Sequence, residues 1–206
     1  MTPQWLRRQS SGDLLVFFGG WGLGSGIVEG IDGATSLLFV EDYRSIDLDP
    51  DMLAGYKAVD FIGYSFGVAA MLHWLCATGH PSRRLVAVNG TIHSVSAELG
   101  IAPETVAATA DGLSPATFAK FARRAGHSRA LPPLDIAARR NELHAIAARG
   151  SAPARNFNRI WISRRDRIMP PAAQHRAWAD QADKVRDLDA PHQPFAPGQT
   201  WQEWLA

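Results

Sequence analysis

One short stretch, GYSFG at residues 63–67, has the spacing of a serine nucleophile held between two glycines. A serine hydroxyl is a poor nucleophile at neutral pH, so it needs a base that takes its proton and an acid that orients that base. Later in the chain, RIWISRRD brings Asp166 just past a strand-like run, and APHQPF brings His192 into a loop. This order of side chains predicts acyl transfer through a covalent intermediate, with Ser65 attacking, His192 as base and Asp166 as orienting acid.

Two of these roles have competing candidates. Asp189 flanks the strand-like run KVRDLD and is an alternative acid for His192. His93 follows NGTI at a strand end and is the main alternative for the base. The remaining histidines are expected to be packing or surface residues. Cys76 lies well along a helical pattern, where we expect a buried apolar role.

Acyl transfer also needs two backbone N–H groups that stabilise the developing oxyanion. Phe66, directly after the serine, is expected to supply one of them. The glycine-rich loop in FFGGWGLGSG, after an early strand-like run, supplies the other, from Trp21 in preference to Gly20. The same loop is not a nucleotide-binding motif, because G-x-G-x-x-G would require glycine at position 27, which is Ile27, and no G-x-x-x-x-G-K-[ST] occurs.

Short runs rich in branched and aromatic residues alternate with helical patterns along most of the chain. The strand-like runs are 14–18, 37–40, 58–62, 85–89 and 159–163, followed by KVRDLD, and the helical runs outside the central region are 66–78 and 171–182. This alternation predicts an α/β fold with a mostly parallel sheet and flanking helices. A strand that leads through GYSFG directly into a helix is the nucleophile elbow of a compact α/β-hydrolase fold.

Residues 93–155 interrupt the alternation. They contain no convincing strand, are rich in alanine and arginine, and include helical patterns at 115–125 and 135–148. An insertion between two strands is expected to lie over the carboxyl edge of the sheet, where ligand sites of open α/β sheets are found. The length then predicts a single domain, 1–206, with 93–155 as a small helical cap.

The composition is 46% hydrophobic and 20% charged with a net charge of +1, so it favours no particular partner. No apolar run approaches the roughly 18 residues that a membrane-spanning helix needs. The run LLVFF is interrupted by GGWG before it forms a signal-peptide core. A single cysteine excludes an internal disulfide and fits a reducing compartment, so we expect a cytoplasmic protein. No histidines, cysteines or acids have metal-ligand spacing, and no metal or cofactor is expected.

The predicted cap carries an uneven positive charge. Its candidate binding residues are Arg123, Arg124, Arg139, Arg140 and Arg155. Two interpretations stay open, a solvated helical face and a docking surface for an acidic partner beside the site entrance. Nucleic acid is not favoured, because aromatic residues are not interleaved with these arginines.

Several blocks of the sequence resemble one family. The blocks LLVFFGGWGLGSG, VEDYRSIDLD, DFIGYSFGVAAM, WISRRDRIMP and APHQPF are similar to the BioG (DUF452) family of α/β-hydrolases, from about residue 13 to the C-terminus. The resemblance implies a pimeloyl-[acyl-carrier protein] methyl ester esterase of biotin synthesis. It assigns Ser65, Asp166 and His192 as nucleophile, acid and base, and Trp21 and Phe66 as oxyanion donors. It also implies that the basic cap orients an acidic acyl carrier protein.

The resemblance has one notable departure. The GGWG loop matches the HGWG loop of related esterases, but Gly19 stands where those have histidine, which changes how the loop is anchored. Two alternatives to the implied activity stay open. The same three side chains serve a short-chain carboxylesterase or an acyl thioesterase. A non-catalytic binding protein with this fold is more distant, because it has no reason to keep serine, acid and histidine together.

Overall fold

Seven strands form one sheet in the computed structural model, which describes residues 1–206. The strand order is β1-β3-β2-β4-β5-β6-β7, and every neighbouring pair is parallel except β1 with β3. The strands are β1 (Thr2–Arg7), β2 (Asp13–Phe18), β3 (Ser36–Glu41), β4 (Ala58–Tyr64), β5 (Arg84–Val88), β6 (Arg159–Ser163) and β7 (Val185–Leu188). The predicted mostly parallel sheet is therefore confirmed.

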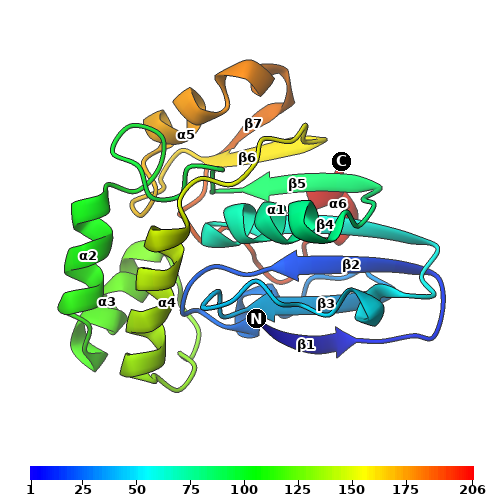
Figure 1. The fold of residues 1–206 in the computed structure, drawn as a ribbon, viewed down its shortest axis with the longest axis horizontal. Helices are drawn as coiled ribbons and strands as arrows, with labels where there is room; N and C mark the ends of the chain where they lie inside the picture. Colours follow the sequence, from blue (N-terminus) through cyan, green and yellow to red (C-terminus); the bar gives the residue numbers. More distant parts are fainter.

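Helices cover both faces of this sheet and its carboxyl edge (Figure 1). They are α1 (Phe66–Thr78), α2 (Pro103–Asp111), α3 (Pro115–Ala125), α4 (Ile136–Arg149), α5 (Pro171–Ala177) and α6 (Trp201–Leu205), with short 3₁₀ helices η1 (Ser25–Val28), η2 (Pro50–Leu53) and η3 (Ala179–Lys184). No helix has both the length and the apolar character that a membrane crossing would need.

Alternate residues of the central strands are buried on opposite faces of the sheet, as the strand geometry requires. In β2, Val16 and Phe18 belong to the hydrophobic cluster that includes Leu72 and other residues of α1. Phe17 belongs to a second cluster, in which its ring lies 5.6 Å from that of Trp201 in α6. The central strands are thus buried on both faces, which explains their nearly unbroken apolar runs.

The helices α2, α3 and α4 all lie between β5 and β6 in the sequence. Figure 1 shows them beside the carboxyl ends of the parallel strands, toward which the arrows of β2 and β5 point. Val106, Phe118 and Leu143, one from each helix, belong to the same hydrophobic cluster as the α1 face of the sheet. The inserted helices therefore pack onto the core beside the edge where the site residues emerge.

Among the strands and α-helices, the structure departs from the predicted elements in four places, one of which is the short C-terminal helix α6, for which no helical pattern was predicted. The strand β1 was not predicted, because an edge strand containing Pro3 has a largely exposed, mixed sequence. The helix α2 was also missed, since only Val106 and Ala110 of its residues are buried and the helical period is weak. The predicted helix 171–182 ends early, because Gln181 has non-helical dihedral angles within the 3₁₀ segment that follows α5.

The expectation that Cys76 is buried is wrong. It lies in the last turn of α1, and residues 76–78 are all exposed, whereas Trp74 and Leu75 just before them are buried. Position along the helix, and not residue type, decides the burial of this cysteine.

Candidate active site

Ser65 lies at the sharp turn between β4 and α1, with φ of 57° and ψ of −126°. Residues other than glycine rarely adopt such a backbone conformation, which is typical of strained functional turns. The two flanking glycines make the turn possible. A Cβ at Gly63 would lie 2.6 Å from the Cα of Val68, and one at Gly67 would collide with the carbonyl oxygen of Phe18. The two glycines of GxSxG are therefore needed because the neighbouring backbone leaves no room for a side chain at either position.

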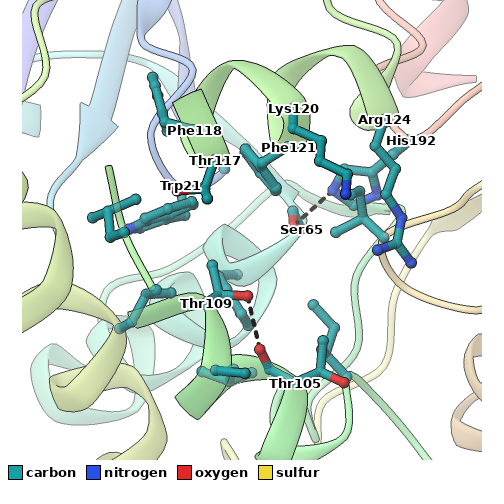
Figure 2. A pocket seen from close by; sticks show the side chains of 18 of the residues that line it. Trp21, Ser65, Thr105, Thr109, Thr117, Phe118, Lys120, Phe121, Arg124 and His192 are labelled. Carbon is teal, nitrogen blue, oxygen red and sulfur yellow. Dashed lines mark hydrogen bonds between the residues drawn. The ribbon is translucent and has the colours of Figure 1, made fainter. Parts of the chain in front are cut away.

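Three predicted side chains meet at this turn. His192 Nε2 lies 3.0 Å from Ser65 Oγ, and His192 Nδ1 lies 2.7 Å from Asp166 Oδ2. All three residues are buried, with at most 6% of their surface exposed. With the carboxylate accepting from Nδ1, Nε2 is left to accept the proton of the serine hydroxyl, which is the arrangement that nucleophile activation requires. Figure 2 shows the hydrogen bond between Ser65 and His192 at the cavity.

The carboxylate of Asp166 is held in one orientation by its own loop. Its Oδ1 accepts from the backbone N–H groups of Ile168 at 2.8 Å and Met169 at 2.9 Å. Its Oδ2 accepts from Gln174 Nε2 at 3.0 Å, in addition to His192. Gln174 lies in α5, and no role for it was predicted from the sequence. Four donors thus surround this carboxylate and aim one oxygen at the imidazole.

The alternative acid and base lie elsewhere. Asp189 is exposed and forms an ion pair with Arg165 at 2.8 Å. His93 Nδ1 lies 2.7 Å from the hydroxyl of Ser151, and His93 does not line the cavity above Ser65. Neither residue contacts the serine.

Asn89, just after β5, connects the two segments that carry the acid and the base. Its Nδ2 donates to the carbonyl oxygen of His192 at 2.7 Å and to Ser163 Oγ at 2.8 Å, and its Oδ1 accepts from the backbone N–H of Ser163 at 2.7 Å. The residue is fully buried and has φ of 48°, a conformation that asparagine tolerates better than most residues. This role was not predicted from the sequence, although an asparagine at the end of a predicted strand was a usable signal.

The two predicted oxyanion donors come from different segments, the glycine-rich loop after β2 and the start of α1. Phe66 is the first residue of α1, so its N–H has no acceptor within the helix. The backbone N–H of Trp21 has no hydrogen-bond acceptor within the chain. Both residues line the same cavity as Ser65 and His192. Gly20 passes close to the serine, because a Cβ on it would lie 3.3 Å from Ser65 Cβ. The geometry is compatible with a pair of backbone donors at Ser65.

A cavity of about 570 Å³ opens above Ser65, between the sheet edge and the inserted helices. Its apolar lining includes Leu23, Val106, Leu113, Phe118, Phe121 and Leu143. Its exposed polar lining includes Glu104, Thr105, Thr117, Lys120 and Arg124. Figure 2 shows Lys120 and Arg124 extending from α3. The cavity therefore combines an apolar interior with a polar, partly cationic rim.

Two of the five predicted cap arginines are engaged within the protein. Arg139 pairs with Glu142 at 2.9 Å and with Glu41 at 3.4 Å. Burial raises the pKa of the Glu142 carboxyl, although the charge of Arg139 opposes that shift. Arg140 donates from Nε to the carbonyl oxygen of Ala110 at 3.0 Å. These contacts tie α4 to β3 and α2.

The other three arginines form no ion pair. Arg123 and Arg124 are exposed in the last turn of α3, one turn after the exposed Lys120. Arg155 is half-buried in the loop before β6. Of the five predicted arginines, two are therefore held by contacts within the fold, and three have side chains without an ion-pair partner.

The seven-stranded sheet and the strand–turn–helix at Ser65 define the class of the protein as the α/β-hydrolase fold. An esterase from Exiguobacterium antarcticum has the same fold, with a TM-score of 0.63 and 14% identity over 95% of this chain and 88% of that one. The chain belongs to the BioG family, described as pimeloyl-ACP methyl esterase BioG, whose sequence profile matches residues 1–204.

Two relatives extend this comparison. The crystal structure of BioG from Haemophilus influenzae covers the whole of both chains with a TM-score of 0.86 and 24% identity. A protein of Bacteroides fragilis, named malonyl-[acyl-carrier protein] O-methyltransferase, is 31% identical over 192 residues. That match takes in 87% of this chain but 39% of the Bacteroides protein, so the chain spans about two fifths of that relative's length.

Proposed function

We propose that this chain is a serine esterase that hydrolyses the methyl ester of pimeloyl-acyl carrier protein in biotin synthesis. The observation that carries the proposal is the hydrogen-bonded series Ser65–His192–Asp166 beside a mainly apolar cavity, in a chain of the BioG family. The three residues are proposed as nucleophile, base and orienting acid. The apolar interior suits a methylene chain, and the open rim leaves room for the carrier outside.

In the first half of the proposed reaction, Ser65 Oγ attacks the carbonyl carbon of the methyl ester. His192 Nε2 takes the serine proton, and the tetrahedral oxyanion accepts hydrogen bonds from the N–H groups of Trp21 and Phe66. When the C–O bond to the methoxy group breaks, His192 gives this proton to the departing oxygen, and methanol leaves. Asp166 keeps the imidazole oriented and stabilises its positive charge throughout.

In the second half, water attacks the acyl-enzyme with His192 again as base. A second tetrahedral oxyanion forms in the same position, and its collapse returns the proton to Ser65 and releases the free carboxylate. The carrier thioester at the other end of the acyl chain stays intact. This scheme requires no metal or cofactor.

We further propose that the exposed cations of α3 orient the carrier. The family resemblance implies an acyl carrier protein as partner, and such carriers are strongly acidic. Lys120, Arg123 and Arg124 are exposed and form no ion pair. Lys120 and Arg124 line the cavity itself, together with one acid, Glu104. Exposed charges of this kind act mainly on the rate of encounter and on orientation.

The deciding experiment incubates the wild-type protein and Ser65→Ala with pimeloyl-carrier-protein methyl ester and follows the products by mass spectrometry. The proposal expects the wild type alone to remove one CH₂ from the acyl group while the carrier linkage survives. Release of free carrier protein would instead identify an acyl thioesterase. An unchanged substrate, with Ser65 still labelled by a fluorophosphonate, would indicate a serine hydrolase of another ester.

A further inference from the structure

The loop that carries the proposed oxyanion donor is held by a residue outside the three catalytic positions. We call residues 19–21 the oxyanion loop. At its start, the N–H of Gly19 donates to the carbonyl oxygen of Val40 at 2.8 Å. The hydroxyl of Tyr43 donates to the carbonyl oxygen of Gly19 at 2.7 Å, and the same hydroxyl lies 3.1 Å from the carbonyl oxygen of Val40, so its shorter contact is to the loop. Both partners come from β3 or the turn directly after it, so this turn fixes both sides of the first residue of the loop.

The loop has no room for a side chain at position 19 that could anchor it from within. A Cβ on Gly19 would lie 2.6 Å from the Cζ atom of Phe39, too close for a non-bonded contact, and Phe39 is fully buried. The loop must therefore be anchored from outside itself. Because Gly19 is followed by Gly20, two successive residues would have wide conformational freedom without such an anchor.

Tyr43 is itself held firmly. It is fully buried, its N–H donates to Glu142 Oε1 at 3.1 Å, and its carbonyl oxygen accepts from Arg149 Nη2 at 2.6 Å. Both partners lie in α4. Burial raises the pKa of the Tyr43 phenol well above its ordinary value, and the charges of Glu142 and Glu41 act in the same direction. The hydroxyl therefore keeps the proton that it donates to the loop.

We propose that Tyr43 is a positioning residue for oxyanion stabilisation, because its hydroxyl sets the orientation of the peptide that leads to the Trp21 N–H. The inference rests on the proposed esterase function. The carbonyl that Tyr43 holds belongs to the peptide between Gly19 and Gly20, and the next peptide carries the Trp21 N–H. A rotation of the first peptide therefore moves the proposed donor directly.

A second anchor lies at the other end of the loop. The indole Nε1 of Trp21 donates to the carbonyl oxygen of Arg139 at 3.0 Å, and the ring packs edge-on against Phe118 and Phe121. These contacts hold the side chain of Trp21, whereas Tyr43 holds the backbone that precedes it. Orientation of the Trp21 N–H thus depends on both anchors.

The test substitutes Tyr43→Phe, which removes one oxygen atom. With a small p-nitrophenyl ester, we expect kcat to fall about 10- to 100-fold while KM stays close to the wild-type value, because the donor is displaced in the transition state. The rate of fluorophosphonate attachment to Ser65, which passes through a similar oxyanion, should fall in parallel. The matched control is Tyr56→Phe, whose hydroxyl also donates to a backbone carbonyl, that of Gln9 at 2.9 Å, but lies away from the cavity.

Rates are expressed per labelled serine at completion, so that loss of folded protein lowers the count of sites and not the rate per site. A kcat for Tyr43→Phe equal to that of Tyr56→Phe would overturn the inference. A rise in KM with unchanged kcat would overturn it too, because that pattern indicates a substrate contact. A wild-type protein inert to both reagents would overturn the proposed function and this role of Tyr43 with it.

Discussion

Polar side chains of the proposed catalytic residues are buried and hydrogen-bonded, whereas those at the mouth of the cavity are exposed and form no ion pair. Every side-chain polar atom of Ser65, Asp166 and His192 has a hydrogen-bond partner, and all three residues are buried. On α3, Lys120 and Arg124 line the same cavity but are exposed and form no ion pair. Both regions line one cavity, yet the polar groups of the first are fully hydrogen-bonded and those of the second are exposed.

This contrast indicates that the two regions serve different steps of the proposed reaction. Charge that develops in a transition state is stabilised best by groups that need no rearrangement, which favours a buried and fully bonded site. Attraction of an acidic partner acts over a longer range and is served by exposed charges. Substitutions in the first region should therefore affect every ester, and those in the second only a carrier-bound substrate.

The largest effect is expected from Asp166→Asn. The amide leaves the shape of the site nearly unchanged but removes the acceptor that holds His192 Nδ1, so kcat should fall about 10⁴-fold on small and carrier-bound esters alike. Steady-state kinetics on both substrates measures this. The control is Asp189→Asn, which should behave as wild type, since Asp189 pairs with Arg165 on the surface. Equal losses in the two variants would contradict the assignment of Asp166.

A smaller effect is expected from Asn89→Gly. Glycine accepts the positive φ at this position, so the variant removes only the side chain that joins His192 to Ser163. We expect kcat to fall about 10-fold and the free energy of unfolding to fall by about 1–3 kcal/mol, because buried polar groups lose their partners. Kinetics and urea unfolding give the two values.

The matched variant is Ser163→Ala, which removes one acceptor of Asn89 and leaves its bond to the His192 carbonyl. It should lose less activity than Asn89→Gly. Full activity in Asn89→Gly, with the stability loss alone, would show that Asn89 supports the fold without positioning the base.

The smallest effect is expected at the mouth of the cavity. Arg124→Glu should lower kcat/KM for the carrier-bound ester about 3- to 10-fold at low salt, and the difference should shrink as salt screens the charge. Hydrolysis of a p-nitrophenyl ester should be unchanged. Arg8→Glu makes the same charge change in an exposed residue just after β1, outside the cavity, and is expected to have no effect. A loss on both substrates would break the separation between the two regions.

Some of these features were predictable from short segments. The strained turn at Ser65 follows from GxSxG between a buried strand and a helix, because glycines at 63 and 67 are needed wherever the backbones come this close. The central strands were predictable because burial on both faces leaves continuous apolar runs. By contrast, β1 lies at the sheet edge and has no buried residue, and α2 buries only two residues, so neither has the apolar run that marks an element.

The parallel α/β architecture, the turn at Ser65 and the order of serine, acid and histidine could all be read from the amino-acid sequence, because they depend on local spacing. The folded arrangement was needed to show that Asp166, and not Asp189, contacts His192, and that Arg139 forms ion pairs with Glu142 and Glu41 within the fold. It also brought Tyr43 to Gly19. Most of these contacts join residues that are far apart in the sequence. In the others, one of several chemically identical residues, such as Asp166 and Asp189, makes the contact. Which of these residues come into contact depends on how the sheet and the helices pack together, and a short sequence pattern does not contain that information.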